Sequence, residues 1–355
     1  MFFDIAFFSY GLSSLIGFLG YNYKPKRESY KARNVEFVIP TVANEKTINS
    51  LKEVIEKIRS FDGYRINIII DEGSKLELND KNIRIIVVPN NFDGVKCKGR
   101  AIQYFIKNYV EDNKWYVFLD DDSYPLDDNF LYEIPYYEKK GYVASNGILI
   151  PRNGKSKLTY ILDFLRYFDD IFMFRLCTGK LKKGLIGFHG ELLIAKGSVL
   201  KEIGFKTNTL VEDYVFSQEL IKKGYKTWQS STKVSIKSPN SLKDFWKQRA
   251  RWYKGILKEL KNTNLKAIPL IVLRMFGGIF SSMLLFPLWF VFPPTTPLAF
   301  FGFFGMLYYL SAYTYGILKS KSYKYFLILP FMGIFETLSL IFIPQIKKFI
   351  VIDKN

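Results

Sequence analysis

The sequence predicts a doubly wound α/β domain that lies between apolar segments at the two ends of the chain. Short apolar runs typical of buried parallel strands recur through the first part of the sequence, and helical patterns lie between most of them. Apolar residues gather at both ends in stretches long enough to cross a bilayer. The 355 residues supply ample material for a buried core between these stretches.

Four apolar runs are the predicted strands of this domain. They are VEFVIP (Val35 to Pro40), INIII (Ile66 to Ile70), IRIIVV (Ile83 to Val88) and WYVFL (Trp115 to Leu119). Helical patterns run from Glu45 to Arg59 and from Gly99 to Val110. In a doubly wound sheet, ligands bind at the carboxyl ends of the strands, and polar motifs begin at those ends here.

The N-terminal apolar stretch, Phe2 to Leu19, is about as long as a hydrocarbon core is thick. It has no basic start and no A-x-A-like site, so we expect an uncleaved anchor and not a signal peptide. Basic residues follow it, namely Lys24, Lys26, Arg27, Lys31 and Arg33. By the positive-inside rule, the middle of the chain then faces the cytoplasm.

The C-terminal region predicts two further spans. Residues Ala267 to Phe292 form one, FPPTTP (ending at Pro297) makes an outer turn, and Leu298 to Leu318 returns to a basic stretch with Lys319, Lys321 and Lys324. Arg274 within the first of these spans is expected to snorkel or to face protein.

The last apolar stretch, Tyr325 to Ile343, leaves two interpretations open. It contains Pro330 and Glu336 and is followed by Lys347 and Lys348. A re-entrant or interfacial hairpin and a fourth span are both compatible with this pattern.

The formal net charge of +18 is explained by a membrane surface and by a site for a nucleotide diphosphate. Zinc-finger spacing, heptads and RNP-like strands are missing from the sequence, so nucleic-acid binding is disfavoured. The two cysteines, Cys97 and Cys177, make no disulfide framework, which fits a reducing cytosol.

Two acidic motifs follow the first two strands. PTVANE contains Pro40, Asn44 and Glu45, and IDEGS begins at Asp71. A carboxylate at a strand end can accept hydrogen bonds from a ribose or a base, although helix capping and a turn would explain each motif alone. No G-x-G-x-x-G follows a strand, which disfavours a dinucleotide cofactor.

The triple Asp120, Asp121 and Asp122 directly follows the strand WYVFL. Adjacent carboxylates repel one another unless a cation neutralises them, and hard oxygen ligands suit Mg²⁺ or Mn²⁺ holding a diphosphate. A solvated acidic turn is the alternative. We expect Asp120 and Asp122 to bind the metal.

Glu212 and Asp213 open a helical pattern that continues to Lys223. A carboxylate here is stabilised by the helix dipole and can take a proton from an acceptor hydroxyl, whereas an isolated pair would more often be a helix cap.

Two aromatic segments are expected to lie at the membrane surface. The stretch Ser241 to Leu260 is predicted to be an amphipathic interfacial helix. Within its QRARW motif, Arg251 suits a phosphate and Trp252 suits a sugar ring. Tyr160 to Phe174 is interrupted by charged residues and is expected to be a second interfacial helix.

Together, PTVANE, IDEGS, KGRA (Lys98 to Ala101), LDDDSYP, VED and QRARW resemble the inverting family 2 glycosyltransferases of the GT-A fold, over about residues 35 to 256. That group contains cellulose, chitin and hyaluronan synthases and ceramide glucosyltransferase. The stretches GFHGELLIAKGSVLKEIGF, VEDYVFSQELIKKGYK and SPNSLKDFWKQRARWYKG look most like membrane β-mannosyltransferases of the egghead type. The resemblance implies a mixed sheet, a nucleotide-sugar donor and a metal cofactor.

By this resemblance, Asp213 would be the catalytic base, and Asp120 and Asp122 would bind the metal. The nucleotide would contact Pro40, Glu45, Asp71, Lys98, Arg100 and Asp120. The acceptor and diphosphate would contact Gln248, Arg251, Trp252, His189 and Glu212.

Two positions depart from the family pattern. Asp71-Glu72 replaces the usual Asp-Asp, and Val211-Glu212-Asp213 replaces Thr-Glu-Asp, which loses a hydroxyl but keeps both acids. His189, the sole histidine, is either structural or part of an acceptor pocket with Gly190 and Glu191; alone it cannot form a histidine metal cage.

The predicted enzyme is a metal-dependent, multi-pass membrane glycosyltransferase that moves a hexose from UDP or GDP to a lipid or glycolipid. A processive polysaccharide synthase is the alternative, and an inactive membrane scaffold is a third. The expected layout is an anchor (1–22), a cytoplasmic GT-A domain (34–240), an interfacial helix with QxxRW (241–265) and a C-terminal membrane region (266–355).

Overall fold

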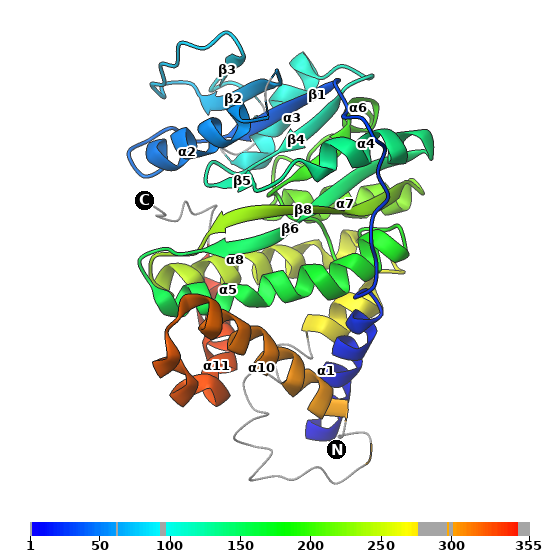
Figure 1. The fold of residues 1–355 in the computed structure, drawn as a ribbon, viewed down its shortest axis with the longest axis vertical. Coiled ribbons are helices and arrows are strands. Elements are labelled where there is room, and N and C mark those ends of the chain that lie inside the picture. The colour runs from blue at the N-terminus through cyan, green and yellow to red at the C-terminus, as the bar shows by residue number, and fades with distance from the viewer. Residues whose placement is uncertain (1, 62, 93–96, 276–296, 298–300, 347–355) are drawn as a thin grey trace. The chain divides into compact units, whose positions relative to one another are not determined.

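A computed structural model describes residues 2–61, 63–92, 97–275, 297 and 301–346 (Figure 1). The chain divides into two compact units. The helical unit consists of Met1–Tyr23, Pro151–Cys177 and Ser238–Ile352, and the sheet unit consists of Lys24–Ile150, Thr178–Lys237 and Asp353–Asn355.

The sheet unit contains one mixed sheet of eight strands in the order β3-β2-β1-β4-β7-β6-β8-β5. The strands β1, β2, β3 and β4 are parallel, whereas β7 runs antiparallel to both β4 and β6, and β5 runs antiparallel to β8. Their bounds are β1 Val35–Pro40, β2 Arg65–Asp71, β3 Ile83–Val88, β4 Trp115–Phe118, β5 Ser123–Pro125, β6 Tyr142–Arg152, β7 Leu193–Lys196 and β8 Lys226–Lys237.

Helices cover both faces of this sheet (Figure 1). Side chains of α2 (Ile48–Arg59) and α4 (Asn129–Lys139) share one core with Phe37 of β1. Side chains of α3 (Lys98–Tyr109), α6 (Gly197–Ile203) and α7 (Glu212–Lys222) share the other core with Val38 of β1. Successive residues of a strand point to opposite faces, so the apolar run of β1 is buried on both sides. The predicted α/β class is confirmed.

The bounds of the predicted elements match those in the structure or differ from them by a few residues. The strands β1 and β3 have the predicted bounds, and β2 is longer by one residue at each end. Helix α2 begins at Ile48 and not at Glu45, because Asn44 forms a turn in which Thr47 N donates to Asn44 O at 2.9 Å and Lys46 N donates to Asn44 Oδ1 at 3.0 Å.

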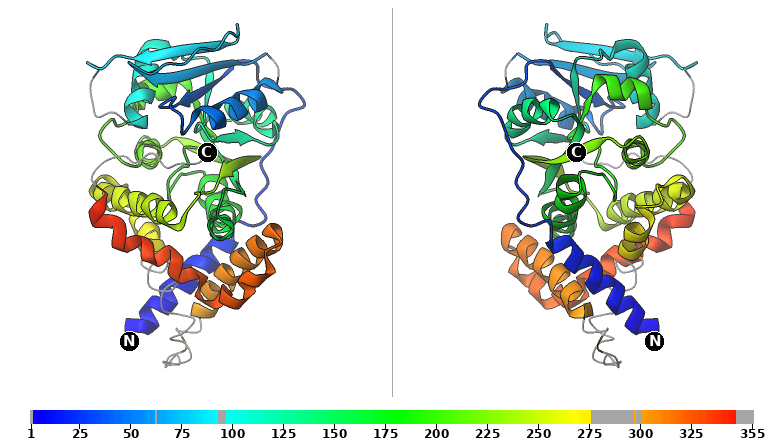
Figure 2. Two further views of the ribbon diagram at one scale, coloured as in Figure 1. Left: turned by 90° about the vertical axis from the view of Figure 1, so that its left-hand side faces the viewer. Right: turned by 90° about the vertical axis from the view of Figure 1, so that its right-hand side faces the viewer.

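The helical unit packs its helices closely around a small apolar core (Figure 2). Helix α10 contacts both α1 and α5. Gly11 of α1 permits this approach, because a Cβ at that position would collide with the carbonyl of Phe301. The elements of the unit are α1 Phe2–Phe18, α5 Lys157–Asp169, α8 Leu242–Glu259, η2 Leu260–Asn262, α10 Phe301–Ser320, η4 Tyr323–Phe331, α11 Met332–Thr337 and η5 Leu338–Gln345. The π-helix η1 Asp170–Lys180 belongs to this unit up to Cys177.

The stretch Tyr160 to Phe174, predicted to be an interfacial helix, packs against other helices of the unit, and its position relative to a membrane stays a prediction. This stretch lies in α5 and η1, where Ile161 and Asp163 are both buried by protein. The charged residues that interrupt it are paired inside the unit: Asp163 pairs with Arg249, and Asp169 pairs with Arg274. Arg274 therefore faces protein, one of its two predicted alternatives.

Among the described residues, the continuous stretch Tyr323–Gln345 is the one helical segment long and apolar enough to cross a membrane. Most of the predicted second span and outer turn, the start of the third span, and Lys347 with Lys348 lie outside the described residues. The N-terminal anchor and the multi-pass arrangement stay predictions.

Candidate active site

The candidate site begins at the sheet edge where β2, β1 and β4 end. These strands are parallel neighbours, so the residues that follow them gather at one edge. Asp71 ends β2 and Pro40 ends β1. Thr41 Oγ1 donates a hydrogen bond of 2.6 Å to Asp121 Oδ2, which ties the loop after β1 to the acidic loop after β4.

Lys98, the first residue of α3, lies among the carboxylates of this edge. Its ammonium pairs with Asp120 and lies 3.9 Å from Glu212 Oε1, and its side chain is 14% exposed. Burial disfavours the charged form, but the carboxylates of Asp120, Glu212 and Asp213 outweigh it and raise the pKa of Lys98. The lysine therefore stays charged and holds together acids from the loop after β4 and from the first turn of α7, Glu212–Lys222.

Asp213 lies in the first turn of α7, where Tyr214 N donates to its Oδ1 at 2.8 Å. The side chain is half-buried and so retains access to a ligand. Partial burial and the neighbouring Glu212 carboxylate raise the pKa of Asp213 to about 7, although Lys98 opposes the shift. A carboxylate with this pKa is suited to accept a proton near neutral pH.

The loop before β7 reaches the same cluster. A Cβ added at Gly190 would collide with Lys98 Nζ and would lie 3.5 Å from Asp213 Oδ2. Glu191 also contributes to the raised pKa of Asp213. The predicted trio of His189, Gly190 and Glu191 thus lies beside the predicted base.

Asn146 of β6 holds this loop and was not singled out in the sequence. His189 N donates to Asn146 Oδ1 at 2.5 Å, and Asn146 Nδ2 donates to His189 O at 3.0 Å and to Leu192 O at 3.2 Å. Leu192 has a φ of 53°, which is unusual for a residue with a branched side chain. Two polar residues, Ser145 and Asn146, among the apolar residues of β6 were the signal that could have identified Asn146.

Arg100 supports Asp71 from within the protein. Its guanidinium donates to Asp71 Oδ1 at 2.9 Å, to Pro89 O, and through Nε to Phe92 O at 3.1 Å. Arg100 is 1% exposed, whereas the Asp71 side chain is 29% exposed. Asp71 is therefore available to a ligand, and Arg100 sets its orientation.

Asp120 and Asp122 are the predicted metal ligands. Within the ranges that the structure describes, no group of three or more His, Cys, Asp or Glu side chains forms a ready-made metal site. This does not argue against Mg²⁺ or Mn²⁺ bound with a nucleotide, because such ions are commonly held by one or two carboxylates together with substrate phosphates. Asp120 and Asp122 are carboxylates of the kind used in such sites; Asp120 pairs with Lys98, and Asp122 is buried.

The other predicted residues lie in different surroundings. Glu45 is exposed in the turn before α2. Gln248, Arg251 and Trp252 lie on α8 in the helical unit. The guanidinium groups of Arg249 and Arg166 lie over the Trp252 ring, at 4.6 and 4.9 Å from its centroid. The stacking surface of Trp252 is therefore used, at least in part, by arginine.

The family model described as "Glycosyl transferase family group 2" matches residues 115–338, more than half of the chain. The chain belongs to this family. The chain is also similar to two curated invertebrate proteins. It is 25% identical to beta-1,4-mannosyltransferase bre-3 of Caenorhabditis elegans, over 81% of this chain and 66% of that protein. It is 27% identical to beta-1,4-mannosyltransferase egh of Drosophila melanogaster, over 55% of this chain and 45% of that protein. The predicted resemblance to egghead-type enzymes is confirmed.

The chain spans just under two thirds of the length of the nematode relative. Its fold is similar to that of a mannosyltransferase from Pyrobaculum calidifontis solved with GDP-Man and Mn²⁺, with a TM-score of 0.59, 13% identity, and coverage of 98% of this chain and 99% of that one. At this identity the likeness concerns the fold.

Proposed function

We propose that this glycosyltransferase moves a hexose from a nucleotide sugar to a lipid or glycolipid acceptor and forms a β-linkage with inversion. The observation that carries the proposal is the position of the Asp213 carboxylate within the cluster of Lys98, Asp120, Glu212 and Glu191. The names of the curated relatives favour mannose among the hexoses.

In the proposed reaction, Asp213 removes the proton from the acceptor hydroxyl. The hydroxyl oxygen then bonds to the anomeric carbon, and the bond from that carbon to the diphosphate oxygen breaks on the opposite face. The electron pair of the broken bond leaves with the nucleoside diphosphate. A pKa of about 7 gives Asp213 enough basicity for this step while a useful fraction stays deprotonated near neutral pH.

The developing negative charge on the diphosphate needs positive partners. Lys98 is such a partner, since its ammonium already lies at Asp120. Asp120 and Asp122 would hold Mg²⁺ or Mn²⁺, and a bound divalent ion neutralises charge on a departing diphosphate. We assign Arg251 and Gln248 of the QxxRW motif to the diphosphate and the acceptor.

Asp71 is proposed to bind the nucleotide, with Pro40 and Glu45 from the loop after β1. The ordered pair of Arg100 and Asp71 supports this assignment, because a fixed carboxylate at a strand end can accept hydrogen bonds from a ribose or a base.

A membrane location is part of the proposal. The apolar helix α1, the charged and aromatic helix α8 and the apolar stretch Tyr323–Gln345 support an anchored enzyme with an acceptor in the bilayer. The layout is the predicted one, with an anchor (1–22), a cytoplasmic catalytic domain (34–240), an interfacial helix (241–265) and a membrane region (266–355).

The test is transfer from labelled nucleotide sugars by membranes that contain the full chain, with and without Mn²⁺, beginning with GDP-mannose. The Asp213→Asn variant should lose nearly all transfer. The control is Glu219→Gln, which removes a carboxylate from the same helix where Glu219 pairs with Lys222 at the surface. Label in a lipid extract supports the proposal; label in an insoluble polymer indicates a synthase, and activity retained by Asp213→Asn contradicts the assigned base.

A further inference from the structure

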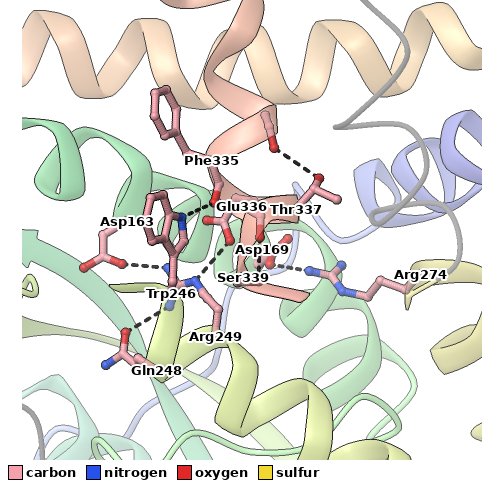
Figure 3. A network of polar contacts seen from close by, with 11 residues as sticks. Asp163, Asp169, Trp246, Gln248, Arg249, Arg274, Phe335, Glu336, Thr337 and Ser339 are labelled. Atoms are coloured by element: carbon pink, nitrogen blue, oxygen red, sulfur yellow. Dashed lines mark hydrogen bonds and ion pairs between the residues drawn. The ribbon is translucent and has the colours of Figure 1, made fainter. Parts of the chain in front are cut away.

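Arg249 of α8 lies at the centre of a buried charge network in the helical unit (Figure 3). Its Nη2 is 2.7 Å from Asp163 Oδ1 of α5, and its Nε is 3.2 Å from Glu336 Oε2 of α11. The three side chains are 6%, 1% and 8% exposed, respectively. Nη1 of Arg249 also donates to Gln248 Oε1 at 3.2 Å. One guanidinium therefore joins three helices and a residue of the QRARW motif.

Other contacts run from α8 to the same C-terminal stretch. Trp246 Nε1 donates to Phe335 O at 2.7 Å, and the Trp246 ring stacks on Phe342 with centroids 5.5 Å apart. Lys254 Nζ donates to Ile346 O at 2.6 Å and to Ile343 O at 3.4 Å. The carbonyls at the end of η5 thus have a cationic partner, which is favourable at a helix C-terminus.

These contacts follow the direction of both segments. Trp246, in the first half of α8, contacts Phe335, and Lys254, further along the helix, contacts Ile346. The two segments therefore run in the same direction. The second half of the apolar stretch therefore extends along α8. Because α8 is rich in charged residues, it cannot lie in the hydrocarbon core, and a segment that follows it must stay at the same membrane surface.

We propose that Tyr323–Gln345 does not cross the membrane: it returns to the side on which α8 lies, and Arg249 with Glu336 makes it a support for the helix that carries QRARW. This inference rests on the proposed membrane location of α8. It explains the acid at position 336, since an isolated carboxylate in an apolar segment is costly whereas one paired with a buried guanidinium is compensated.

The first experiment measures on which side each end of the stretch lies. Lys321→Cys and Gln345→Cys, both at exposed positions, are made singly in a full-length Cys97→Ser, Cys177→Ala background. Sealed vesicles are treated with a membrane-impermeant maleimide, and labelling is normalised to that after detergent. Lys201→Cys, on the exposed end of α6, reports the side of the sheet unit.

All three cysteines are expected to react from the same side. Labelling of Gln345→Cys from that side at less than a tenth of its normalised value would overturn the proposal, because the segment would then end across the membrane or within it. The labelling measurement does not depend on sugar transfer. The proposed topology can therefore be wrong while the proposed enzymatic function is correct, and the enzymatic function can be wrong while the topology is correct.

The second experiment tests the ion pair. Arg249→Met, Glu336→Met and the double variant are compared with Lys258→Met, which alters an exposed lysine on the same helix. Arg249→Met should lower the Tm of the full chain by several degrees, because it leaves buried carboxylates without their cation. The double variant should lose less than the sum of the two single variants. Strictly additive losses would contradict the pairing.

Discussion

Replacing Asn146 with leucine should disorder the loop that borders the proposed base. Leucine is similar in size but cannot form the three hydrogen bonds that Asn146 makes with His189 and Leu192. At about 1 kcal/mol for each bond, the loss is about 3 kcal/mol. The positive φ of Leu192 adds to this effect, because strained backbone persists only while its surroundings enforce it.

In a domain of this size, each kcal/mol of lost unfolding free energy lowers the Tm by about 2–4 °C. A loss of about 3 kcal/mol should therefore lower the Tm by roughly 6–12 °C. Transfer should fall at least about tenfold at temperatures where the variant is still folded, because small displacements of positioning groups are costly in catalysis. Gly190 lies against Lys98 and Asp213, so a loop that moves also changes the surroundings of the base.

The assays are thermal unfolding of the purified full chain in detergent and initial rates of transfer from GDP-mannose. Asn108→Asp is the matched control, since Asn108 donates only to Tyr104 O on an exposed helix surface. Wild-type Tm and wild-type rates in Asn146→Leu would contradict this prediction, because the three hydrogen bonds of Asn146 would then contribute nothing to the order of the loop.

Three further predictions concern the same site. The kcat/KM for transfer should rise from acid pH and level off above about 7, because Asp213 must be deprotonated and its raised pKa moves that requirement to neutral pH; a flat profile over this range would exclude it as the base. Gly190→Ala should change the Tm little but lower kcat/KM, because the added methyl displaces only the flexible end of Lys98; equal activity would show that the position of Lys98 is unimportant. Arg100→Met should raise the KM for the nucleotide sugar by at least about tenfold with a smaller effect on kcat, since it frees Asp71; a loss confined to kcat would argue against a role in nucleotide binding.

The sequence was enough to predict the four parallel strands, the helices between most of them and the location of the acidic motifs. Buried strands such as β1 are apolar on both faces, and the buried side of α2 repeats at Leu51, Val54, Ile55 and Ile58, so local patterns suffice to identify them. Asp71 ends one parallel strand and Asp120 comes shortly after another, and the general rule for parallel sheets places such residues at one edge.

Which of these charges meet depends on the folding of the whole chain. Lys98, Asp120 and Asp213 come from distant parts of the chain, so no local pattern encodes their contact or the resulting pKa of Asp213. Asn146 and Arg249 gained their roles in the same way, since a buried polar side chain is defined by partners that only folding supplies. The burial of α5 within its unit also depends on tertiary contacts, because its acids Asp163 and Asp169 are tolerated there only when they pair with Arg249 and Arg274.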